Sequence, residues 1–273
     1  MAAKQESPVV LTIEKNIATI TLNDPAKLNA LSILGYYQLA CALREAAAHP
    51  TTTLTLLTGA GRFFSAGADV TGGFSSGIQD DAVDDRQFWF RRFAANNIDV
   101  ARAFYQHPKI LIVALNGPAV GLSAALIAFA DFIYCTKKTF IMTPFSSLGL
   151  VAEGGASAMF VKRMGIAKAN EALILSKRIT APELLQCGFV NKVFESEGEA
   201  FAKEVREWVD DQFGEHLNHG SMIKIKKLIV EGWERDLEAA NVREAVGGVE
   251  RFVDGIPQEQ FLAIASGEKK HKL

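Results

Sequence analysis

The feature that most constrains this chain is a stretch of 21 residues without a charge, from Ile110 to Ala130. An uncharged segment of that length must be buried, either in a lipid bilayer or in a protein core. Its centre is the tripeptide Asn-Gly-Pro at 116–118, a turn signal that interrupts any helix. We therefore predict no membrane span, but a buried strand over 110–115, a tight loop and a buried helix.

Length and composition indicate an ordinary globular protein. The chain has 273 residues, 49% of them hydrophobic and 22% charged, which suits one large domain or one domain with a helical appendage. The formal net charge of -2 gives no reason to expect nucleic acid as a partner. Cysteines stand at 41, 135 and 187 without a Cys-x-x-Cys motif, and the five histidines lack metal-ligand spacing. We expect a reducing compartment, no metal and no cofactor.

Apolar periodicity predicts alternating strands and helices in the first two-thirds of the chain, and helices in the last third. Alternation on both sides of Lys15 predicts a hairpin of strands at 9–13 and 17–22. Ser32 is suited to cap a helix, and Thr180 with Glu183 has the form of a capping box. Further strands are expected at 53–58, 110–115, 132–135 and 139–142, and C-terminal helices at 197–213, 221–230, 233–246 and 257–266. This order predicts an α/β fold with a C-terminal helical region.

Three loops rich in small residues are candidates for chemistry: Ser65–Asp69, Asn116–Ser123 and Gly149–Gly155. Small side chains let a ligand approach the backbone, so that an exposed N–H group can donate to an anion. The alternative is that these loops are plain glycine turns and strand-to-helix junctions without a catalytic role.

Two charged residues in loops are further candidates. Glu153 lies among apolar and small residues just ahead of a predicted helix, where burial would raise its pKa and suit it to act as a base. The alternative is a carboxylate that only complements the helix dipole. Lys27 precedes the first helix and is either a solvated loop lysine or a phosphate contact.

In order and spacing, these segments resemble the crotonase (enoyl-CoA hydratase/isomerase) superfamily over residues 8–195. The stretch Asn23–Leu31 resembles its first CoA-binding loop, Arg62–Asp69 its first oxyanion-hole loop, and Asn116–Leu122 its second. The resemblance implies a crotonase-like spiral of ββα units over 1–200, which holds the CoA site and the active site. It also implies a helical region at 201–273 that mediates homotrimers or homohexamers.

The resemblance further implies how a thioester would be held. Its carbonyl oxygen would accept two backbone N–H bonds, which by position come from Ala68 and Leu122. Fixed donors there would stabilise the oxyanion that forms when a proton alpha to the thioester is removed. The substrate-binding residues carried over by position are Lys27, Ala30, Ala66, Gly67, Ala68, Asp69, Val70 and Leu122.

The carboxylates that separate the reactions of this superfamily favour an isomerase. Hydratases carry two glutamates that activate water, and the matching positions here hold Ala125 and Phe145. Glu153 stands in a Leu-x-x-Glu-Gly-Gly setting similar to that of peroxisomal Δ3,Δ2-enoyl-CoA isomerases, and Asn97 matches a residue near their catalytic glutamate. The resemblance implies isomerisation of cis- or trans-3-enoyl-CoA to trans-2-enoyl-CoA in the β-oxidation of unsaturated fatty acids. Glu153 would move the proton from C2 to C4.

Other readings stay open: a dienoyl-CoA isomerase, a hydratase or another crotonase-type enzyme, and a non-catalytic acyl-CoA-binding protein. A dienoyl-CoA isomerase is expected to need a second acidic group in the acyl pocket, and the sequence offers no convincing candidate. A protein that only binds has no need of a carboxylate beside a thioester.

The last residues predict a location. His271-Lys272-Leu273 resembles the peroxisomal Ser-Lys-Leu signal, so we expect import into the peroxisomal matrix through the import receptor. The role of the polar, acidic segment 75–85 is left open.

Overall fold

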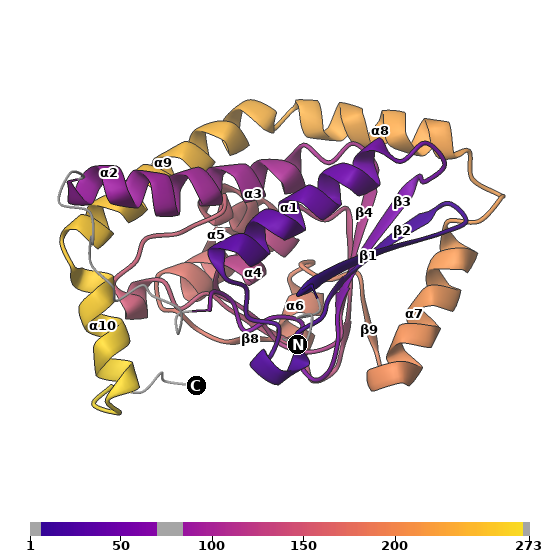
Figure 1. The fold of residues 1–273 in the computed structure, drawn as a ribbon. Coiled ribbons are helices and arrows are strands. Elements are labelled where there is room, and N and C mark those ends of the chain that lie inside the picture. Colours follow the sequence, from indigo (N-terminus) through magenta and orange to yellow (C-terminus); the bar gives the residue numbers. More distant parts are fainter. Residues whose placement is uncertain (1–6, 70–83, 270–273) are drawn as a thin grey trace, which may run out of the picture.

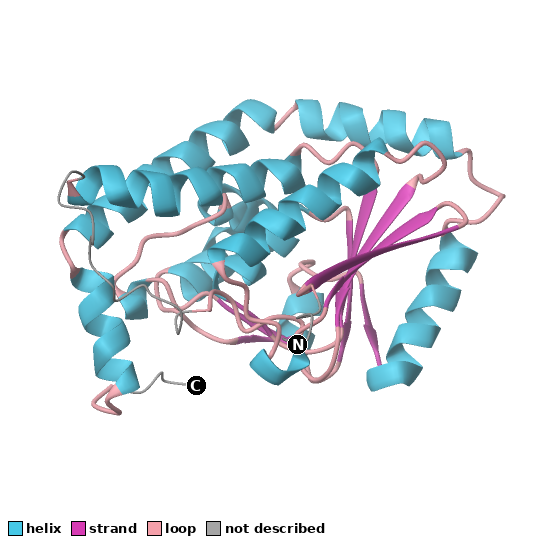
Figure 2. Cartoon of the chain, in the orientation of Figure 1, coloured by secondary structure: helices cyan, strands magenta, loops and turns pink. Residues whose placement is uncertain are grey.

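Residues 7–69 and 84–269 are described by a computed structural model, in which two sheets organise the chain. The larger sheet has the strand order β1-β2-β3-β4-β6-β9 and the smaller one β5-β7-β8. Most helices lie on one side of the larger sheet and α7 on the other (Figure 1). Figure 2 shows the smaller sheet below the helices, away from the larger one. The predicted α/β class is confirmed.

The larger sheet begins with the predicted hairpin, in which β1 (Val9–Glu14) and β2 (Ile17–Leu22) pair antiparallel. The neighbouring strands pair in parallel: β3 (Leu54–Gly59), β4 (Ile110–Leu115), β6 (Phe132–Thr136) and β9 (Lys192–Phe194). The smaller sheet consists of β5 (Ala119–Val120), β7 (Phe140–Met142) and β8 (Ile179–Thr180). Parallel strands need long crossovers, usually helical, which explains the alternation seen in the sequence.

Both faces of the larger sheet are covered. Every residue of β4 is buried, as its uncharged sequence predicts. Because successive side chains of a strand point to opposite faces, Leu111 and Val113 join the core on the side of most helices, whereas Ile110 and Ile112 join the core under α7. A sheet covered on both faces is typical of parallel strands joined by helices.

The helices of the first two-thirds carry the loops that form the candidate site. α1 (Ile33–Ala48) is capped by Ser32, whose side chain accepts a hydrogen bond from Gly35 N. It is followed by α2 (Asp85–Trp89), a π-helical turn (Phe90–Ala94), α3 (Ala95–Tyr105), α4 (Gly121–Leu126), α5 (Ala156–Leu173) and α6 (Ala181–Gln186). At the predicted capping box, Thr180 N donates to Glu183 Oε2 at 2.9 Å. Within the described ranges, no helix is both long and apolar enough to cross a membrane.

The described C-terminal region consists of α7 (Gly198–Gln212), α8 (His219–Glu231), α9 (Glu234–Val253) and α10 (Ile256–Ala265). The prediction that the third of these helices ends near residue 246 is wrong, because α9 continues through Gly248 to Val253. A Cβ at Gly248 would lie 2.2 Å from Phe93 Cε1. The glycine therefore permits a close contact between α9 and the π-helical turn, and does not end the helix.

The apolar stripe of α7 belongs to the core of the chain. Phe201, Val205 and Val209 are buried in one cluster with Ile17 and Leu54 of the sheet. The predicted domain boundary at residue 200 falls inside α7, a helix that packs on the sheet.

Three predicted features lie outside the described residues: Val70, the part of the acidic segment up to residue 83, and His271–Leu273. The roles assigned to Val70 and to His271–Leu273 stay predictions, and the role of the acidic segment stays open.

Candidate active site

The first candidate donor, Ala68, lies in a loop that pairs with the segment before α1. Leu31 N donates to Gly67 O at 2.8 Å and Asp69 N donates to Leu31 O at 2.9 Å, which makes a parallel bridge between Leu31 and Ala68. The N–H and C=O groups of Leu31 are thus hydrogen-bonded to Gly67 and Asp69, the residues on either side of Ala68. The N–H of Ala68 therefore points away from Leu31. Within the described chain, that N–H donates to no protein acceptor.

The second candidate donor, Leu122, lies in the first turn of α4. Just before it, Val120 N donates to Ser65 O at 2.9 Å, so the two loops pair where the helix begins. Gly121 then turns the chain with a φ of 60°. The first N–H groups of a helix have no acceptor inside the helix, so the N–H of Leu122 is available to a ligand.

The two loops approach each other closely because they carry glycines. A Cβ at Gly67, where φ is 92°, would lie 2.9 Å from Val120 O, and a Cβ at Gly121 would lie 3.9 Å from Gly67 Cα. No other residue adopts such backbone conformations so readily at so short a distance. This contact brings Ala68 and Leu122 to one cavity.

The cavity has a volume of about 550 Å³ and mostly apolar walls. Its polar side chains come from Tyr36, Arg92, Asn96, Asn97 and Glu153. Among the described residues that line it, Glu153 is the only acidic one. The C-terminal helices contribute Phe252, Phe261 and Ile264, which sequence analysis did not assign to the site.

Glu153 reaches this cavity from the loop before α5. Gly154 and Gly155 follow it with φ of 65° and 77°, and a Cβ at Gly154 would lie 2.7 Å from Leu122 Cδ1. The glutamate therefore stands next to the second donor. It is 7% exposed, and Asn97 Nδ2 donates to its Oε2 at 3.2 Å. Burial raises the pKa of Glu153 to about 8, against the effect of the Asn97 hydrogen bond and with a smaller contribution from the charge of Glu244.

Glu244, a second buried carboxylate near Glu153, is not predictable from the local sequence. Its oxygens accept hydrogen bonds from Gly155 N at 2.6 Å and Ser157 N at 2.8 Å, so it caps the start of α5. Burial raises its pKa, while those hydrogen bonds act in the opposite direction. No local pattern signals this role, because Glu244 comes from the middle of α9.

The two positions that hold glutamate in hydratases are apolar here. Ala125 is fully buried, and Phe145 is 3% exposed and lines the cavity. Neither side chain can accept a hydrogen bond from a water molecule.

The residues predicted to bind CoA divide between two adjoining cavities. Ala66, Gly67 and Ala68 line the one that holds Glu153. Lys27, Ala30 and Asp69 line a smaller one of about 290 Å³. Lys27 Nζ lies 3.2 Å from Asp69 Oδ2, and the lysine side chain is 55% exposed. The structure thus brings together most of the predicted residues without testing what they bind.

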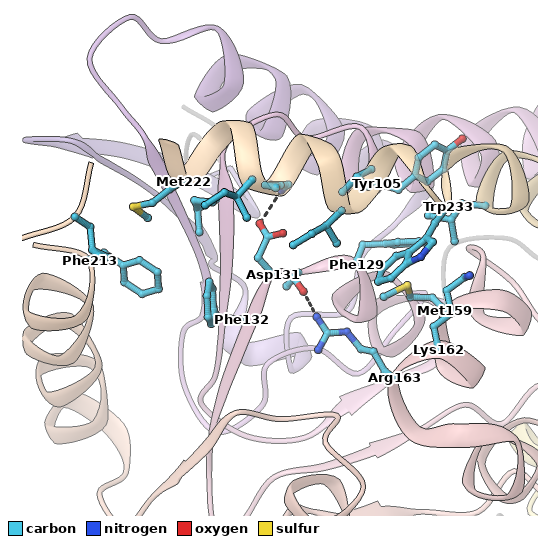
Figure 3. A pocket seen from close by; sticks show the side chains of 18 residues that line it. Tyr105, Phe129, Asp131, Phe132, Met159, Lys162, Arg163, Phe213, Met222 and Trp233 are labelled. Carbon is cyan, nitrogen blue, oxygen red and sulfur yellow. Dashed lines mark hydrogen bonds and ion pairs between the residues drawn. The ribbon is translucent and has the colours of Figure 1, made fainter. Parts of the chain in front are cut away.

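Another cavity, of about 410 Å³, lies under α8 and contains none of the predicted site residues (Figure 3). Its charged groups have structural partners. Lys226 Nζ lies 2.7 Å from Asp131 Oδ2, and the Arg163 guanidinium donates to the carbonyls of Ala128, Ala130 and Phe189. We read it as a packing gap beneath α8.

No group of three or more potential metal ligands occurs among the residues with a described position.

Comparison with known proteins shows to which family the chain is similar. A model of the enoyl-CoA hydratase/isomerase family matches residues 12–245. The chain is 52% identical to a Δ(3,5)-Δ(2,4)-dienoyl-CoA isomerase of Pyricularia oryzae, over 97% of this chain and 99% of that protein. It is 33% identical to a 3,2-trans-enoyl-CoA isomerase of Saccharomyces cerevisiae, over 99% and 98% of the two chains.

The fold is similar to that of an enoyl-CoA hydratase/isomerase from Pseudoalteromonas atlantica, with a TM-score of 0.83 over 97% of this chain and all of the other. At 24% identity, this likeness shows the fold alone. Together with the family match, it confirms the predicted crotonase resemblance. The chain belongs to the enoyl-CoA hydratase/isomerase family.

Proposed function

We propose that this chain isomerises a 3-enoyl-CoA to the trans-2-enoyl-CoA, with Glu153 as the carboxylate that moves the proton. The observation that carries the proposal is the position of Glu153, the only acidic side chain among the described residues that line the cavity of Ala68 and Leu122. A thioester oxygen bound by those two amides would place the carbons next to it beside Glu153.

The reaction would proceed in two steps. The Glu153 carboxylate takes a proton from C2, and the electrons of that C–H bond form a C1=C2 bond while charge collects on the thioester oxygen. The amides of Ala68 and Leu122 stabilise this dienolate. Glu153 then returns the proton to C4, the C2=C3 bond forms and the carbonyl is restored. No water and no cofactor are consumed.

The raised pKa of Glu153 suits both steps. A pKa of about 8 leaves a usable fraction of carboxylate at neutral pH and makes that carboxylate a stronger base than an ordinary glutamate. The same value allows the proton to be given up again at C4.

Hydration of the double bond is not expected. Phe145 and Ala125 stand where a water molecule would need acceptors, and the apolar walls disfavour such a molecule. Exclusion of water also protects the dienolate from side reactions.

A second candidate is isomerisation of a 3,5-dienoyl-CoA to the 2,4-dienoyl-CoA, favoured by the relative with 52% identity. That reaction also begins with loss of a C2 proton, but the proton must arrive at C6, two bonds farther along the chain than C4. The described walls of the cavity offer no second acidic group for that delivery.

The test is an assay of the purified protein on 3-hexenoyl-CoA, 3,5-octadienoyl-CoA and 2-hexenoyl-CoA. We expect isomerisation of the first, slower reaction of the second and negligible hydration of the third. Glu153→Gln should lower kcat by at least about 100-fold, in line with general-base contributions. Glu45→Gln makes the same chemical change on an exposed face of α1 and should leave kcat unchanged.

Each other outcome has a defined meaning. A higher kcat/KM on the dienoyl substrate would favour the second candidate. Rapid hydration of 2-hexenoyl-CoA, or near-normal isomerisation by Glu153→Gln, would refute the role of Glu153 as sole proton carrier.

Binding and assembly follow as proposals from the same reading. We propose that Lys27 contacts a phosphate of CoA once its bond to Asp69 is exchanged.

We also propose a homotrimer or homohexamer built through the C-terminal helices, because Ile225, Leu228 and Ile229 of α8 are 57%, 72% and 52% exposed. Light scattering of the wild type beside Leu228→Glu tests the assembly. Peroxisomal import stays a prediction, tested by a fluorescent fusion with and without the last three residues.

A further inference from the structure

Three buried hydroxyl groups form a chain beside the two amide donors. Tyr36 Oη lies 3.0 Å from Ser123 Oγ, which lies 2.9 Å from Ser65 Oγ. Ser65 Oγ also donates to Asn29 O at 2.8 Å and accepts from Gly67 N at 3.1 Å. The three hydroxyl-bearing residues are 2%, 4% and 0% exposed, so water does not take the place of these partners.

One arrangement of protons satisfies these contacts. A hydroxyl has one hydrogen to donate, but it can accept more than one bond. Because Asn29 O can only accept, Ser65 gives it the hydroxyl hydrogen and must accept from Ser123. Ser123 has then used its own hydrogen and must accept from Tyr36. The chain therefore runs in one direction, from Tyr36 through Ser123 and Ser65 to the carbonyl of Asn29.

This chain joins the two segments that carry the donors. Ser123 follows Leu122 directly, and Ser65 holds the N–H of Gly67, the residue before Ala68. We propose that Ser65 and Ser123 are positioning residues that fix the spacing and direction of the two amides toward a thioester oxygen. The inference rests on the proposed function, since it requires a thioester oxygen bound between these amides.

The physical reason is that each hydroxyl serves a buried donor. Ser65→Ala leaves Gly67 N–H and the Ser123 hydroxyl without their acceptor, and Ser123→Ala does the same to the Tyr36 hydroxyl. A buried donor that loses its partner carries its full desolvation cost, which favours local movement toward another acceptor. Amides stabilise an oxyanion only over a narrow range of distances, so a small movement costs transition-state stabilisation. Substrate binding is spread over the whole cavity and should change less.

The test uses a thioester that binds but cannot isomerise, butanoyl-CoA labelled with ¹³C at the carbonyl. Its isotope-edited infrared spectrum should show the C=O stretch of the bound thioester lowered relative to free butanoyl-CoA in the wild type. We expect this lowering to be reduced to roughly half or less in Ser65→Ala and Ser123→Ala, with kcat on 3-hexenoyl-CoA reduced about tenfold or more and KM changed less than about twofold. Tyr36→Phe removes only the first donor of the chain, the one farthest from Asn29 O, and should have the smallest effect.

The matched control is Thr55→Val, which removes a fully buried hydroxyl on β3 that lies 2.9 Å from His107 Nε2. Thr55 does not line the cavity, so the variant should lower thermal stability without changing the C=O stretch. If Ser65→Ala does not fold, the C=O stretch and the kcat of Ser123→Ala test the proposal. If that variant is also too unstable, the double variant with Tyr36→Phe removes the phenol that Ser123→Ala leaves unpaired.

The outcomes separate this inference from the proposed function. No lowering of the C=O stretch in the wild type would contradict the proposed function itself. A lowering that persists undiminished in the folded serine variants would overturn the positioning role alone and leave the two amides as the oxyanion site.

Discussion

The burial of Glu153 makes the stability of the folded chain depend on pH, and Glu153→Gln should remove that dependence. Glu153 is 7% exposed, and burial raises its pKa from 4.5 to about 8. A carboxyl group whose pKa is higher in the folded than in the unfolded chain binds its proton more tightly in the folded state. Its contribution to stability is complete below pH 4.5 and is lost as the pH rises through 8. Glutamine is uncharged at every pH, so the Glu153→Gln variant does not lose stability in this way as the pH rises.

The two pKa values give the size of the effect. Compared with its value in acidic solution, the free energy of unfolding is lowered by the ionisation of Glu153. The decrease is about 1 kcal/mol at pH 5, about 3 kcal/mol at pH 7 and about 5 kcal/mol at pH 9. Glu244 acts in the same direction, because burial raises its pKa as well, but it is present in both proteins and largely cancels from their difference. The stability advantage of Glu153→Gln should therefore grow by about 4 kcal/mol between pH 5 and pH 9.

The assay is urea denaturation at pH 5, 7 and 9, at one protein concentration, followed by the fluorescence of the tryptophans. The midpoint of Glu153→Gln should move above that of the wild type as the pH rises. Glu45→Gln, on an exposed face of α1, should follow the wild type at each pH. A constant difference between the wild type and Glu153→Gln from pH 5 to pH 9 would show that the carboxyl of Glu153 is not desolvated, and the argument for a raised pKa would fail.

Three further substitutions test other parts of the site. Asn97→Ala removes the amide that favours the ionised form of Glu153, so the pH at which kcat/KM reaches half of its plateau should rise above that of the wild type, as measured by steady-state kinetics on 3-hexenoyl-CoA. Gly67→Ala forces a Cβ to 2.9 Å from a backbone oxygen at a φ of 92°, so the loop of the first donor must move and kcat should fall about 100-fold or more, while circular dichroism stays native. Gly248→Val places a Cβ 2.2 Å from the Phe93 ring and should destabilise the fold by at least about 1–3 kcal/mol, measured by urea unfolding.

The strands and the two glycine loops of the candidate site are predictable because their signals are local. β4 is buried on both faces, so its sequence carries no charge, whereas β2 alternates because Ile20 and Leu22 are buried and the threonines beside them are only partly buried. The loops at 65–69 and 116–123 need small residues wherever two backbones approach, and the glycines that show this are visible in the sequence. In each case, the residue that must be apolar or must be glycine is itself the residue that shows the pattern in the sequence.

Other parts of the site depend on contacts between distant segments. The helix predicted at 233–246 continues to Val253, because the sequence does not show that Phe93 packs against Gly248. Phe261 and Ile264 line the cavity that holds Glu153 only because α10 folds back toward it after α9. The direction of Asn97 likewise depends on how α3, entered through a π-helical turn, packs beside the loop of Glu153. No spacing along the chain encodes these approaches.

Glu153 and Glu244 show how two neighbouring carboxylates acquire different roles from their surroundings. Glu244 accepts two backbone N–H groups at the start of α5, so its position is fixed and it does not line the cavity. Glu153 has the Asn97 amide as its hydrogen-bond partner and faces apolar walls, so under the proposed function its carboxyl is the one that exchanges a proton with a substrate carbon. Groups whose environments differ in this way separate into a structural and a reactive member. The two amides that donate to Glu244 belong to the backbone that follows Glu153, so Glu244 fixes the loop from which, under the proposed function, Glu153 acts.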